Sequence, residues 1–106
     1  MTHSLDSATI EALRSRGVDL TKPRRTIHYF YARDREHALA LAGRLARDGR
    51  DIDVHKSGRD WAVVVACVLV VDAPTMAQIK RDFEAAASAT HADYDGWEAA
   101  VDSVSD

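Results

Sequence analysis

The chain has 106 residues, of which 46% are hydrophobic and 29% charged, a composition that predicts one compact domain and excludes collagen-like and low-complexity sequences. The formal charge of −3 is divided unevenly: residues 1–60 hold 12 Lys and Arg against 9 Asp and Glu, whereas residues 61–106 hold 2 against 8, so we expect no phosphate-binding surface over the whole domain. The longest apolar run, residues 61–71, is too short to cross a membrane, and the first residues do not resemble a secretory signal. A single Cys permits no internal disulfide, so we expect a cytoplasmic protein.

The beginning of the chain predicts a helix followed by a linker. Residues 7–16 form a short helical pattern that Gly17 can terminate. The apolar stripe of this segment is narrow, so the helix must dock on another part of the protein to be stable. Residues 18–25 are expected to be a loop, because Pro23 disfavours a helical conformation at the residue before it.

Residues 26–32 predict the first strand, because they are rich in β-branched and aromatic side chains. Alternation divides this strand into two sets, Ile27, Tyr29 and Tyr31 on one face and His28, Phe30 and Ala32 on the other. Both sets are largely apolar, so the pattern leaves open which face is buried. His28, which lies between hydrophobic residues, is expected to be a hydrogen-bonded core residue rather than a ligand or an acid/base group.

From Asp34 the apolar period becomes helical, and Gly49 is the expected stop of this helix. Its buried stripe consists of four residues at helical spacing: Ala38, Leu41, Ala42 and Leu45. Residues 51–55 then alternate as a half-exposed strand, and Ser57 and Gly58 suit a tight turn.

Residues 61–70 predict a third strand that is apolar on both faces and therefore belongs in the middle of a sheet. Asp72 is the expected cap of the next helix, with Pro74 in its first turn. The buried stripe of that helix is expected to be Met76, Ile79 and Phe83, with Ala86 or Ala87. Residues 94–101 supply a last strand, which Asp95 and Gly96 are expected to bend.

This order of elements predicts an α+β protein: a ferredoxin-like two-layer sandwich (βαββαβ, four-stranded antiparallel sheet) with an extra N-terminal helix. The expected division is an N-terminal helix and linker (1–20), the ferredoxin-like domain (21–101) and a short acidic tail (102–106). Two helices cover one sheet face, yet both central strands are apolar on both faces. We therefore expect the second face to be covered by the opening helix, by a second copy in a homodimer, or by a protein partner.

Two motifs resemble those of a known family. Residues 17–24 read GVDLTKPR ahead of IHYFY at 27–31, and residues 94–98 read YDGWE. Together with RDG at 47–49 and with Trp61, they are similar to the regulator of ribonuclease E activity B family. This resemblance implies a ferredoxin-like fold and a non-catalytic protein that binds ribonuclease E away from its active centre and alters which RNAs are degraded.

Catalytic and metal sites are not expected. The five His residues show no metal-ligand spacing, so no metal or cofactor is expected. Cys67 lies inside an apolar run where a thiol is inert, and no Gly-rich phosphate loop or nucleophile motif is present. The sequence therefore predicts that the protein is not an enzyme.

The candidate partner-binding residues are the aromatic side chains of the predicted sheet and the turn near its end: Tyr29, Tyr31, Trp61, Tyr94, Asp95, Gly96 and Trp97. Tyr and Trp are frequent interface anchors. The alternative for the turn is structural, with Gly96 supplying a special backbone angle and Trp97 covering the core.

Two other functions remain open. The first is RNA binding, because the RNA-recognition motif shares this element order and stacks bases on aromatic side chains. Direct nucleic-acid binding is disfavoured here, since residues 61–68 lack the basic-Gly-aromatic pattern of that motif and the net charge is negative. The second is a regulatory dimer that senses a small ligand. The sequence favours neither of these two functions over a protein-interaction module that binds another protein. The partner that the resemblance implies is a ribonuclease.

Overall fold

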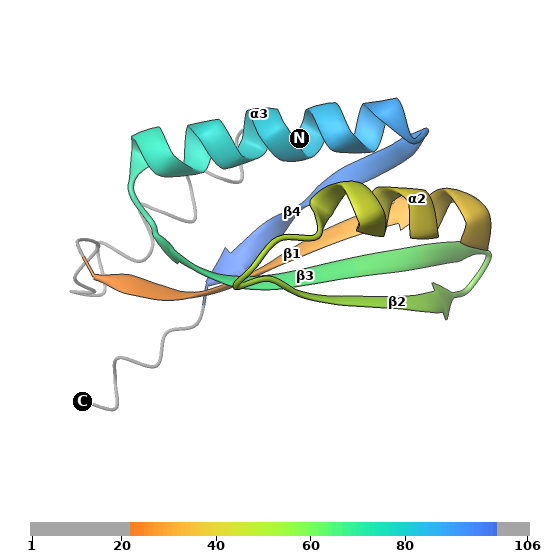
Figure 1. The fold of residues 1–106 in the computed structure, drawn as a ribbon, viewed down its shortest axis with the longest axis horizontal. Helices are drawn as coiled ribbons and strands as arrows, with labels where there is room; N and C mark the ends of the chain where they lie inside the picture. The colour runs from red at the N-terminus through yellow and green to blue at the C-terminus, as the bar shows by residue number, and fades with distance from the viewer. Residues whose placement is uncertain (1–21, 100–106) are drawn as a thin grey trace.

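The computed structural model describes residues 22–99, which form an α+β structure with one four-stranded antiparallel sheet and two helices (Figure 1). The elements are β1 (Pro23–Ala32), α2 (Arg35–Leu45), β2 (Asp51–Ser57), β3 (Asp60–Val70), α3 (Ala73–Ala89) and β4 (Ala92–Ala99). The sheet order is β2-β3-β1-β4, which confirms that the first and third strands are central. The predicted opening helix (7–16) and acidic tail (102–106) lie outside the described residues.

The predicted starts of the first and last strands are wrong. The expected loop 18–25 ends early, because β1 already begins at Pro23, and Arg24 and Arg25 pair with the last residues of β3. Proline is tolerated at the first position of a strand, where its missing N–H costs no ladder bond. The last strand begins at Ala92 rather than at residue 94, since Ala92 pairs with Ala32.

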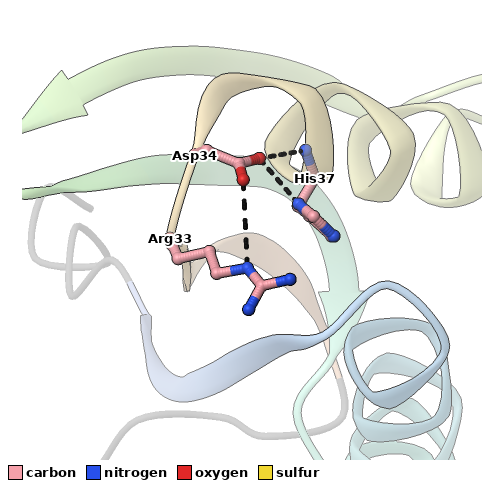
Figure 2. A network of polar contacts seen from close by, with 3 residues as sticks. All are labelled: Arg33, Asp34 and His37. Carbon is pink, nitrogen blue, oxygen red and sulfur yellow. Dashed lines mark hydrogen bonds and ion pairs between the residues drawn. The ribbon is translucent and has the colours of Figure 1, made fainter.

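Both helices begin at an aspartate that caps them. The Asp34 carboxylate accepts the backbone N–H of His37 at 2.8 Å and lies 2.6 Å from the ring Nδ1 of the same residue (Figure 2). The backbone hydrogen bond from His37 is the main reason that the pKa of Asp34 is lowered. The predicted cap of α3 is confirmed, because Asp72 accepts the N–H of Thr75 at 2.8 Å.

The expected stop of α2 at Gly49 is wrong by several residues. The helix ends at Leu45, where Ala46 leaves the helical conformation. Gly49 instead lies in the following turn with a φ of 84°, a left-handed conformation that glycine adopts without strain. Arg50 then donates from Nη1 to the carbonyl of Leu45 at 2.8 Å, so this side chain satisfies a terminal carbonyl of the helix.

The core lies between the helices and one face of the sheet. The buried stripe of α3 is Met76, Ile79, Phe83 and Ala87, as predicted, and that of α2 is Ala38, Leu41 and Leu45. On β1 the residues that face the helices are Thr26, His28, Phe30 and Ala32, all buried. This resolves the choice that the alternation left open. Burying a ring such as that of Phe83 stabilises the fold by about 1.5 to 3 kcal/mol.

Candidate functional site

The face of the sheet away from the helices carries an apolar stripe along the two central strands. Residues directly opposite each other in an antiparallel pair share a face. Tyr29 pairs with Val64, Tyr31 with Ala62 and Ile27 with Ala66. We call this surface the open face; its residues are Ile27, Tyr29, Tyr31, Ala62, Val64, Ala66 and Val68. Both described helices lie on the opposite side of the sheet (Figure 1).

Exposure differs along the open face. Val68 is 62% exposed, which is high for a valine of a central strand. Tyr29 and Tyr31 are partly exposed, whereas the two alanines are buried. The hydroxyl of Tyr29 donates to Oε2 of Glu98 at 3.1 Å. Burial, and then this hydrogen bond, raise the pKa of Tyr29, so the phenol remains protonated at neutral pH.

The predicted turn at Tyr94 to Trp97 is part of β4 and contains a β-bulge. The register shifts between Tyr29 and Phe30, so Asp95 is an additional residue in β4. Gly96 has a φ of 111°, which supports the special backbone angle expected for it. The bend expected at this point of the strand is therefore confirmed.

Tyr94 and Trp97 both lie on the helix side of the sheet. Tyr94 is buried, and its ring centroid lies 4.8 Å from that of Phe30 and 5.6 Å from that of Phe83. Trp97 is partly buried, pairs with His28 and packs against the core. Trp61 pairs with Ala32 and also packs against the core from this side.

The seven predicted site residues therefore do not form one surface. Tyr29 and Tyr31 belong to the open face, and Gly96 pairs with Tyr29. Tyr94, Trp97 and Trp61 lie on the helix side, and Asp95 is exposed in the bulge. Sequence spacing alone does not reveal this separation, because the bulge changes the alternation of β4.

A buried chain of hydrogen bonds connects three strands behind the open face. Thr26 Oγ1 donates to the carbonyl of Cys67 at 3.0 Å, so it accepts from Nε2 of His28, which lies 2.9 Å away. Nδ1 of His28 then accepts from the hydroxyl of Tyr94 at 2.8 Å. Burial, and then the positive charge of Arg50, lower the pKa of His28 to about 3. The imidazole is neutral and both nitrogens are occupied, which confirms the expected core role of His28.

A basic hollow of about 380 Å³ lies between the end of α2 and α3, and Arg44, Arg47 and Arg50 contribute to its walls. The guanidinium of Arg50 lies 5.0 Å from the centroid of the Phe83 ring, a cation–π contact. Arg50 is therefore held by the ring and by the carbonyl at the end of α2. From this position its positive charge acts on the buried His28.

Possible metal ligands do not gather in the described part of the chain. The His37 and His91 rings approach to 5.7 Å between centroids. No group of three or more His, Cys, Asp or Glu that could hold a metal is found in residues 22–99. Cys67 is buried and makes a weak contact with Thr26 at 3.7 Å. Neither helix of this region has the length and apolarity to span a membrane.

Comparison with known proteins gives one finding. The family model described as Regulator of ribonuclease activity B matches residues 3–99. No curated protein and no solved structure matches the chain. The family resemblance predicted from the sequence motifs is confirmed.

Proposed function

The chain belongs to the family of regulator of ribonuclease activity B, and on this premise we propose that it is a non-catalytic protein that controls RNA degradation in the cytoplasm by binding a ribonuclease of the ribonuclease E type away from its active centre. The observation that supports a protein partner is the open face. A contiguous apolar stripe that includes the aromatic side chains of Tyr29 and Tyr31 is the kind of surface that marks interaction sites.

We also assign the arrangement to the ferredoxin-like sandwich and treat residues 21–101 as the domain. The support is the order β1-α2-β2-β3-α3-β4 together with the sheet order β2-β3-β1-β4, which correspond to the split βαβ pattern. In this architecture the helices occupy one face of the sheet. Neither described helix covers the other face, and we propose that it is available to a partner.

The buried imidazole of His28 has a structural role, which agrees with a function in binding rather than catalysis. His28 is fully buried, with both ring nitrogens in hydrogen bonds. A general acid or base must reach the proton that it transfers. The imidazole of His28 has no such access to a substrate.

RNA binding is the alternative function, and one observation favours it: Tyr29 and Tyr31 lie on the open face, where the RNA-recognition motif places its stacking rings. The third strand contributes Ala62, Val64 and Ala66 to that face, whereas its aromatic residue, Trp61, lies on the helix side. A base would therefore find stacking partners on one central strand only. The protein-binding function is better supported.

The test is a binding measurement between the purified chain and the purified nuclease, in the absence of RNA, with Tyr31→Ser as the variant. Leu39→Ser is the matched control, since Leu39 is 43% exposed on α2, away from the open face. We expect Tyr31→Ser to weaken binding about tenfold or more, as removal of an aromatic anchor does, and Leu39→Ser to leave it unchanged. Circular dichroism checks that both variants fold. Failure of the wild-type chain to bind the nuclease would refute the proposal.

A further inference from the structure

Acidic side chains line both edges of the open face. On β2, Asp51 pairs with Ala66 and Asp53 with Val64. On the opposite edge, β4, Asp93 pairs with Tyr31 and Glu98 with Ile27. Because paired residues share a face, these four carboxylates stand on the same side as the apolar stripe. All four are exposed.

Positive charge on the same side is small. Arg25 pairs with Val68 at one end of the stripe, and His55 pairs with Ala62 on β2. The Nδ1 atom of His55 lies 2.5 Å from Oδ2 of Asp53, so this imidazole is already engaged. Asp51 and Asp93 have no cation within ion-pair distance in the described part of the chain. The two edges therefore keep a net negative charge.

This charge pattern selects among the occupants of the open face. The phosphates of RNA would be repelled from both edges. A second copy stacked face to face would place carboxylates against carboxylates, whether β2 lies over β2 or over β4 of the other copy. Juxtaposed like charges of this kind oppose association. A segment with apolar residues at its centre and Lys or Arg at its sides would instead match both the stripe and the edges.

We propose that the open face binds a basic, partly apolar segment of a protein partner, with Tyr29, Tyr31 and Val68 contacting its apolar residues and Asp51 and Asp93 pairing with its cations. This inference rests on the proposed function in taking that partner to be the nuclease. The apolar stripe supplies contact area, and the exposed carboxylates accelerate association and orient the segment. Binding through this face is consequently weakened by salt.

The experiment uses the full chain and two purified probes: the nuclease itself and a synthetic Arg-rich peptide with interspersed Leu. A peptide of the same pattern with Glu in place of Arg, and a single-stranded RNA oligonucleotide, serve as comparison probes. The test variant is Asp51→Asn combined with Asp93→Asn. The control variant, Glu36→Gln combined with Asp48→Asn, removes the same charge from exposed residues of α2 and the loop after it.

We expect the test variant to weaken binding of the nuclease and of the Arg-rich peptide by roughly threefold to thirtyfold at low salt, because each exposed ion pair contributes only modestly. The loss should shrink as salt increases. The control variant should bind both probes as the wild-type chain does. Chemical-shift changes caused by the peptide should fall on the open-face residues of β1 and β3 and not on α2 or α3.

The outcomes separate this inference from the proposed function. Nuclease binding that both variants weaken equally would overturn the inference and leave the proposed function standing. An Arg-rich peptide that binds the open face while the nuclease does not bind would support the inference and refute the proposed function. The inference is also overturned if neither basic probe binds, or if the Glu peptide or the RNA binds as strongly as the Arg-rich peptide. Sedimentation of the wild-type chain as a dimer that Tyr29→Ser dissociates would assign the face to a second copy, and would overturn it as well.

Discussion

Replacing Tyr94 with Phe should lower the free energy of unfolding, although it removes only one oxygen atom. The Tyr94 hydroxyl is the donor to Nδ1 of His28, 2.8 Å away, and His28 is fully buried. The Tyr94→Phe variant would retain the ring contacts but leave this nitrogen without its donor. A buried polar atom that loses its partner costs about 1 to 3 kcal/mol. For a domain of this size, a loss of about 2 kcal/mol lowers the Tm by about 8 to 16 °C.

Urea unfolding followed by circular dichroism measures the change, and Tyr29→Phe is the matched control. Tyr29 donates to Glu98 on the exposed side of the sheet, where water replaces the lost hydroxyl, so we expect a change within about 0.5 kcal/mol. Nitrogen-15 NMR of His28 provides a second readout, because the hydrogen-bond chain requires a proton on Nε2 and none on Nδ1. Equal destabilisation by the two substitutions, or a proton on Nδ1 in the wild-type chain, would refute the reasoning.

Two further predictions concern pH and a helix cap. The pKa of His28 is lowered from 6.5 to about 3 in the folded state, so between these values the unfolded chain gains a proton that the folded chain does not. Stability should therefore fall as the pH decreases through this window, by at most about 1.4 kcal/mol per pH unit from this residue. Urea titrations at several pH values should show a shallower slope for His28→Phe, and an unchanged slope would contradict the assignment. Asp72→Ala should cost about 1 kcal/mol because it removes the acceptor for the Thr75 N–H, whereas Asp72→Asn should recover most of the loss; equal losses for the two variants in thermal melts would argue against capping.

The sequence predicted the elements well because their periodicity is local. The stripe of α3 follows from the spacing of its apolar residues, and its start follows from Asp72 and Pro74. The end of α2 was not predictable, since the polypeptide leaves the helix at Ala46, and a side chain from the next loop, Arg50, satisfies the Leu45 carbonyl. That contact depends on tertiary structure.

The candidate site was only partly predictable for a related reason. Both alternation sets of β1 are largely apolar, so hydrophobicity does not indicate which set is buried. The set that contains the polar residues Thr26 and His28 is the buried one, because Tyr94 from β4 and the Cys67 carbonyl from β3 satisfy them. Partners more than forty positions away in the chain determine which set is buried, so the spacing of residues within one strand does not predict it.

The extra residue at Asp95 determines the phase of β4. Side chains of an unbroken strand alternate, so positions 94 and 97 would point to opposite sides of the sheet. Because of the bulge, the alternation of side chains shifts by one residue. The rings of Tyr94 and Trp97 therefore both lie on the helix side of the sheet. If the same residues continued from Tyr94 as a regular strand without the bulge, Gly96 would pair with His28, and Trp97 would pair with Ile27 on the acidic side. The bulge, more than the chemistry of any one side chain within it, thus governs which side chains of β4 lie on each surface of the sheet.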